Sequence, residues 1–142
     1  MRKTVLKSLS VVLLFIFLVS APIHAAADAR ASAWFSGYGA SVVAVGNGKL
    51  NIDFTVVGTG TMTKLGASII DIYKSNGTHV TSISYATKGN GYMMGYNTAY
   101  HSGSVPFSAV SGQKYYAVVK FFAKDSSGAD TRTYTTSIVT AK

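Results

Sequence analysis

The chain has 142 residues, enough for one domain of ordinary size but too few for two. It contains no cysteine, which excludes disulfides, thiol chemistry and a lipid-modified cysteine anchor. Thirteen basic and five acidic residues give a formal net charge of +8. This balance indicates attraction to anionic surfaces such as teichoic acids or acidic glycans, or merely solubility, since the lysines form no block in the sequence.

The first residues have the three-part pattern of a secretory signal peptide. Basic residues precede an uncharged apolar run at residues 9–19, and small residues follow Pro22. The run is well short of the roughly 20 residues that span a bilayer, which argues against a stable transmembrane anchor. We therefore expect a signal peptide over residues 1–27 and a secreted, extracellular domain over residues 28–142. A secreted domain without cysteine favours a Gram-positive bacterial source.

The remaining sequence predicts an all-β protein, because short apolar runs alternate with turn residues and glycine and threonine are frequent. The predicted strands are residues 40–45, 49–57, 67–73, 79–85, 104–110, 114–124 and 131–139. Turns at Gly46-Asn47-Gly48 and Asn76-Gly77 join two pairs of strands as hairpins. Residues 58–61 are expected to interrupt the second strand. Pro106 is expected to place the fifth strand near a sheet edge.

Residues 114–124 have the clearest strand pattern, with aromatic and β-branched side chains repeating at a period of two. One face carries Tyr115, Ala117, Val119, Phe121 and Ala123. The other face carries lysines and is therefore expected to be at least partly in water. The pattern predicts a central strand of an antiparallel β-sandwich.

About seven strands joined by hairpin turns are typical of an immunoglobulin-like sandwich. After residue 110, a glycine turn, Tyr115 or Tyr116, a Ser-Gly loop and a threonine-rich last strand resemble the end of a fibronectin type III domain. The resemblance implies that one of these two tyrosines caps a corner of the sandwich through its hydroxyl. It also implies that Trp34 loosely matches the early tryptophan of that domain.

Residues 93–97, 101–105 and 130–136 are similar to segments of small secreted proteins of Gram-positive bacteria whose function is unknown. This second resemblance covers nearly the whole expected domain. It implies secretion and a sandwich-like domain, and it implies no activity.

Catalysis and metal binding find little support in the residue types present. Asp53 and Asp71 lie on neighbouring predicted strands, but their polar neighbours favour a solvated surface over an acid–base pair. His79 and His101 lie in separate segments without a metal-binding motif. No GxSxG motif is present for a serine nucleophile. We therefore expect a protein that is not an enzyme and needs no metal or cofactor.

Glycine pairs of the form GxG begin at residues 37, 46, 58 and 89. None opens a predicted helix, so they do not indicate phosphate sites. Basic charge with interleaved aromatic residues suits base stacking, but export argues against a nucleic-acid partner.

Residues 92–101, YMMGYNTAYH, which we call the tyrosine segment, are the best candidate for a functional surface. The candidate ligand-binding residues are Tyr92, Met93, Met94, Tyr96, Tyr100 and His101. Aromatic rings with polar tips suit sugar stacking or protein contact, and methionine adds an adaptable apolar surface. The alternative interpretation is that Met93, Met94 and Tyr96 close one end of the sandwich core.

The sequence therefore predicts a secreted, non-catalytic module that contacts the cell envelope, a glycan or another protein. An anionic cell-wall polymer or glycan is the expected partner, with a protein as the other choice. One alternative is a carbohydrate-binding module that uses the tyrosine segment. The other alternative is a membrane-active or toxin-like β protein, in which amphipathic hairpins insert into lipid.

Overall fold

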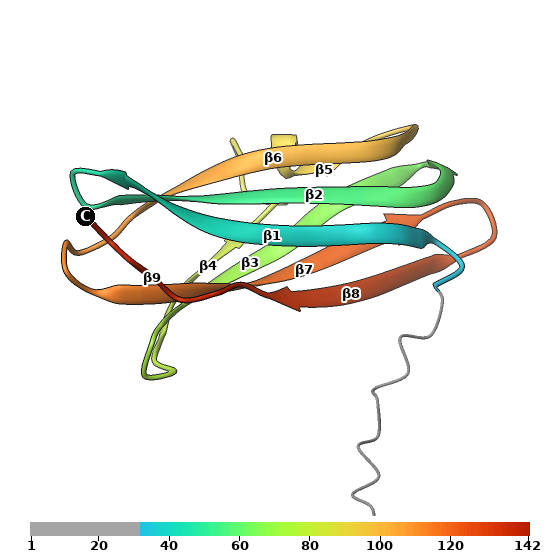
Figure 1. The fold of residues 1–142 in the computed structure, drawn as a ribbon. Coiled ribbons are helices and arrows are strands. Elements are labelled where there is room, and N and C mark those ends of the chain that lie inside the picture. Colours follow the sequence, from blue (N-terminus) through green and yellow to red (C-terminus); the bar gives the residue numbers. More distant parts are fainter. Residues whose placement is uncertain (1–31) are drawn as a thin grey trace, which may run out of the picture. The chain divides into compact units, whose positions relative to one another are not determined.

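Two antiparallel β-sheets face each other in the computed structural model, which describes residues 32–142 (Figure 1). The three-stranded sheet has the order β1 (Phe35–Gly46), β2 (Lys49–Met62) and β6 (Thr98–Ser108). The six-stranded sheet has the main order β4 (His79–Ser84), β3 (Lys64–Lys74), β7 (Lys114–Lys124) and β8 (Ala129–Thr135). Its two short strands are β5 (Met94–Gly95), which pairs with β3, and β9 (Val139–Thr140), which pairs with β7. The 3₁₀ turn η2 (Gly91–Met93) precedes β5.

The predicted all-β class is thus confirmed, with a sandwich-like arrangement of two antiparallel sheets. The expected signal peptide, residues 1–27, and the first residues of the expected domain lie outside the described residues. β7 lies between β3 on one side and β8 and β9 on the other, as predicted for a central strand. β6 is an edge strand, as the proline at residue 106 predicts.

The core forms where the apolar faces of the two sheets meet. On β2 the buried side chains include Leu50, Ile52, Phe54 and Val56, and on β7 they are Tyr115, Ala117, Val119, Phe121 and Ala123. Each set sits at every second position, so one face of each strand enters the core and the other stays at the surface. Burying a side chain the size of leucine or phenylalanine stabilises the fold by roughly 1.5–3 kcal/mol.

The expected interruption of β2 at residues 58–61 is wrong, because β2 continues to Met62. Gly58 does not break the strand but packs closely, since a Cβ at this residue would lie 3.0 Å from Met62 Cγ. The N–H and hydroxyl of Thr59 donate to the carbonyls of Trp34 and Ala33, at 3.0 and 2.7 Å. These bonds extend the pairing of β2 on its β1 side, while on its β6 side the register shifts between Val57 and Met62.

Several other boundaries differ from the prediction, such as the start of β1 at Phe35 rather than residue 40, and two of these differences have a clear cause. β6 begins at Thr98, six residues before the predicted start, because pairing with β2 extends that far. The last strand is divided into β8 and β9 at Thr136, a buried residue. The Thr136 hydroxyl accepts the backbone N–H of Ala117 at 2.9 Å, so a side chain takes the place of a ladder carbonyl.

Tyr115 and Tyr116 have different environments at the start of β7. The Tyr115 hydroxyl accepts the backbone N–H of Val110 at 3.1 Å, and its ring meets Phe107 edge to face. Tyr116 points to the opposite face and stacks on Tyr73, with ring centroids 5.2 Å apart. Of the two candidates, Tyr115 therefore caps the corner between β6 and β7.

Candidate functional site

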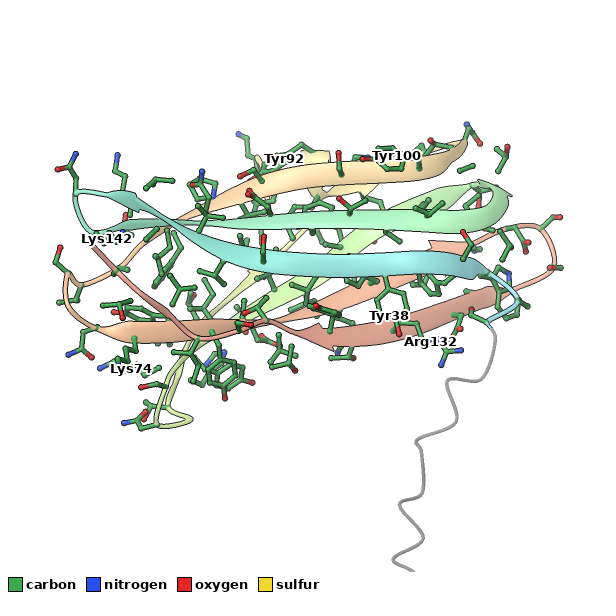
Figure 2. All side chains as sticks on the ribbon, in the orientation of Figure 1. Tyr38, Lys74, Tyr92, Tyr100, Arg132 and Lys142 are labelled. Atoms are coloured by element: carbon green, nitrogen blue, oxygen red, sulfur yellow. The ribbon has the colours of Figure 1, made fainter. Side chains whose placement is uncertain are left out.

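The tyrosine segment forms η2, β5 and the start of β6, beside the edge of the three-stranded sheet. Its three tyrosines are exposed, by 45% at Tyr92, 55% at Tyr96 and 56% at Tyr100. Figure 2 shows Tyr92 and Tyr100 along β6, on the side away from β7 and β8. Met93 and Met94 are buried, at 0% and 3% exposure, and Met93 belongs to the core cluster. The methionines therefore anchor a segment that presents the tyrosines.

Backbone contacts hold this anchor tightly against β3. β5 pairs with β3 in the register Gly66↔Met94, and a Cβ at Gly66 would come within 2.7 Å of Met94 Cα. Only glycine permits this approach of two backbones. Asn90 adds a bond from its side-chain amide to the Ser84 carbonyl at 3.1 Å, and Asn97 turns the chain into β6 with a positive φ of 50°.

His101 supports the segment from the inner side of β6. Its Nε2 lies 2.8 Å from the carbonyl of Tyr92, and since a carbonyl only accepts, Nε2–H is the donor. The imidazole ring also packs on Phe54, with centroids 5.9 Å apart, and fits beside Gly95. His101 is therefore a positioning residue for Tyr92 rather than a side chain directed at solvent.

The structure thus separates the six predicted residues into three exposed rings, two buried anchors and one support. The alternative interpretation, that Met93, Met94 and Tyr96 close one end of the core, fits the two buried methionines but not Tyr96. The Tyr96 ring is exposed and faces the Lys64 ammonium group, 6.0 Å from its centroid. Ligand binding by these residues stays a prediction.

Four lysines lie on the outer face of the six-stranded sheet. Lys120 and Lys124 are exposed on β7, and the Cα of Lys124 pairs with that of Lys64 across the ladder. Lys114 begins the same strand on the same face. Within residues 32–142 no lysine forms an ion pair with a carboxylate. We call Lys64, Lys114, Lys120 and Lys124 the lysine strip. The sequence places Lys114, Lys120 and Lys124 on one face of a single strand, and only the register with β3 adds Lys64 to them.

Strand pairing also brings a serine, a histidine and an aspartate together on this face. The Ser82 hydroxyl donates to Asp71 and lies 3.0 Å from His79 Nε2, which is itself 3.7 Å from the same carboxylate oxygen. A catalytic triad needs the imidazole between the nucleophile and the carboxylate. Here the same ring nitrogen faces both groups and the serine proton points to the aspartate. The arrangement is a surface hydrogen-bond cluster.

The two aspartates considered as a carboxylate pair do not meet. Asp53 lies on β2 and Asp71 on β3, which are consecutive in the chain but belong to different sheets, so the two carboxylates do not face each other across a strand pair. In the described part of the chain no three histidines or carboxylates cluster as metal ligands. Residues 32–142 also contain no helix that is long and apolar enough to cross a membrane.

The loop between β7 and β8 uses its own carboxylate for structure. Asp125 Oδ1 accepts the hydroxyl and N–H of Ser127, at 2.7 and 2.8 Å, and the N–H of Gly128 at 3.0 Å. These bonds, with the Ser127 hydroxyl first, lower the pKa of Asp125 to about 2. The Trp34 indole N–H also lowers the pKa of Asp125, although its geometry falls short of a hydrogen bond. Asp125 is thus a turn-forming residue.

Comparison of the chain with protein-family models, with curated proteins and with solved structures finds no match.

Proposed function

We propose that the protein is a secreted, non-catalytic binding module that attaches to a polymer of a Gram-positive cell envelope. The observation that carries the proposal is the presentation of Tyr92, Tyr96 and Tyr100, half exposed above the buried Met93 and Met94. Rigid aromatic side chains with polar tips bind at a low entropy cost, because few rotamers are lost.

The lysine strip supports an anionic polymer, such as a teichoic acid, as the partner. Lys64 and Lys124 face each other across the ladder, and like charges at directly opposite positions destabilise a sheet. The fold tolerates this cost without a neutralising carboxylate in residues 32–142. A negatively charged polymer would neutralise the strip, because its attraction to the lysines would offset the repulsion between them.

We also propose that the sandwich is of the immunoglobulin or fibronectin type III kind. The strand order supports this, because β4 joins β3, β7 and β8 in one sheet, as strand C′ joins strands C, F and G in variable-type immunoglobulin domains. The corner formed by Tyr115 and Val110 gives further support, since such a tyrosine bonds to backbone a few residues upstream.

The test is a pull-down of the purified protein on isogenic cell walls with and without teichoic acid, at rising salt. Raising the salt from about 0.1 M to about 1 M shortens the Debye length from about 10 Å to about 3 Å. We expect binding that needs teichoic acid and weakens with salt. The Lys120→Gln/Lys124→Gln variant should bind less, whereas its matched control, Lys88→Gln/Lys142→Gln, should bind like wild type.

A carbohydrate-binding module that uses the tyrosine segment is the second candidate, favoured by the same exposed rings. It requires binding that survives high salt and persists without teichoic acid. The variant with Tyr92, Tyr96 and Tyr100 changed to alanine should then lose binding while keeping its melting transition. The control changes Val110 and Ile138, exposed by 64% and 54% elsewhere on the surface, to alanine. No binding to either wall preparation would overturn both candidates.

A further inference from the structure

Gly39 of β1 has no evident structural role, whereas Gly37 flanks a β-bulge where the register with β2 shifts. Glycine weakens the interior of a strand, because it loses more conformational freedom on folding than any other residue. Gly39 does not have a positive φ, and a Cβ on it would meet no described atom within 4 Å. By contrast, Gly46 needs its positive φ and Gly66 its close backbone contact. A strand glycine without such a role often marks a place where a ligand approaches the backbone.

A groove lies at this position, along the edge of β1 where the two sheets come together. It is open to solvent, and its volume is about 370 Å³. Gly39 and Ser41 of β1, Asp53 and Thr55 of β2, and Tyr134 of β8 line it. The register Gly39↔Thr55 and Ser41↔Asp53 sets four of these residues side by side on the outer face of the sheet. Tyr134 reaches the groove from the other sheet.

The lining favours a ligand that is rich in hydrogen-bond donors and uncharged. Asp53 Oδ1 accepts the Ser104 hydroxyl at 2.5 Å, while Oδ2 has no protein donor within residues 32–142. The hydroxyls of Ser41, Thr55 and Tyr134 can each donate and accept. The Tyr134 ring, 38% exposed, offers an apolar surface beside them. The Asp53 carboxylate has no cationic partner in the described residues. Its negative charge repels the anionic polymers that the lysine strip attracts.

We propose that this groove binds one ring of a neutral, hydroxyl-rich sugar chain. A few well-placed polar groups around an aromatic wall are typical of small-ligand sites. The inference goes beyond the proposed function, because the groove contains no residue of the tyrosine segment or the lysine strip. The protein would therefore carry a second contact for a neutral glycan.

The test is a titration of ¹⁵N-labelled protein with four neutral oligosaccharides: maltotetraose, cellotetraose, chitotetraose and mannotetraose. At least one should shift the amide signals of residues 39–41, 53–55 and 134 in a saturable way. Gly39→Val should weaken this binding by about tenfold or more, because the new side chain occupies the groove. It should keep or raise the melting temperature, since valine suits a strand at this open position.

Gly60→Val is the matched control. Gly60 also lies in a strand, also has open space around its Cα and also lacks a positive φ, but it does not line the groove. This variant should bind the sugar within about twofold of wild type. The proposal is overturned if none of the four sugars shifts the groove signals, or if Gly39→Val binds as well as wild type. It is also overturned if only N-acetylarginine amide shifts them, since the groove would then bind a cation. In the cell-wall pull-down, Gly39→Val should bind like wild type. A failure of sugar binding in the groove can therefore be told apart from a failure of the proposed function.

Discussion

Gly66 lies so close to Met94 that a Cβ on the glycine would be 2.7 Å from the methionine Cα. We predict that Gly66→Ala destabilises the protein by about 1–3 kcal/mol, because the added methyl group forces β3 and β5 apart. Urea denaturation measures the change. Gly60→Ala is the control, since its new methyl group meets no described atom within 4 Å. It should be neutral or stabilising by up to about 1 kcal/mol, and equal losses in both variants would contradict the contact.

A second prediction concerns the hydrogen bond from the Val110 N–H to the Tyr115 hydroxyl. Tyr115→Phe removes the hydroxyl that accepts the Val110 N–H and leaves the buried ring in place. The free energy of unfolding should fall by about 1–2 kcal/mol, because a donor loses its partner. Tyr116→Phe, on the outer face of the same strand, should change it by less than about 0.5 kcal/mol. If both variants unfold at the same urea concentration, the corner bond contributes nothing to stability.

The sequence predicted strands best where alternation alone decides the structure. Residues 114–124 were predicted to the residue, because five inward side chains repeat at every second position. The start of β6 was missed, because residues 98–103 show no apolar alternation. There the strand depends on its partner, with Tyr100 paired to Val57 and His101 to Val56. Tertiary pairing, rather than local propensity, extends the strand.

The candidate sites also differ in how far the sequence alone predicts them. The exposed tyrosines come from one short segment, so composition was enough to find them. The groove joins Gly39 to Tyr134, and the lysine strip joins Lys64 to Lys124, so both depend on contacts between residues far apart in the chain. The Gly37-x-Gly39 pair contained the available signal, Gly39, which alone of the two lines the groove. It was considered only as a phosphate motif, for which a helix is needed.

Acid should weaken the fold through the loop between β7 and β8. The pKa of Asp125 is lowered from 3.8 to about 2 by hydrogen bonds from Ser127 and Gly128. The ionised carboxylate therefore stabilises the folded state fully above pH 3.8, and this contribution is lost as the pH falls towards 2. We predict that wild type is more stable than Asp125→Asn at pH 5, and that the difference shrinks steadily down to about pH 2.

Urea midpoints of both proteins at each pH measure this difference. Asp130, whose pKa is lowered chiefly by the Ser32 hydroxyl, is present in both, so its effect cancels. A ¹³C titration of the Asp125 carboxyl group provides a direct check. Titration near the ordinary value of 3.8, or a stability difference that is constant with pH, would contradict the role of the turn hydrogen bonds.

His101 determines how firmly Tyr92 is held. His101→Phe keeps an aromatic ring against Phe54 but loses the Nε2–H bond to the Tyr92 carbonyl. We predict that amide exchange at Met93, whose N–H bonds to Asn90 at the start of the same turn, becomes about fivefold faster, as expected for a loss of about 1 kcal/mol in local stability. Amides in the centre of β7 should exchange at the wild-type rate. Uniformly faster exchange would instead mean that His101 stabilises the whole core, and unchanged exchange at Met93 would mean that β5 alone holds the segment in place.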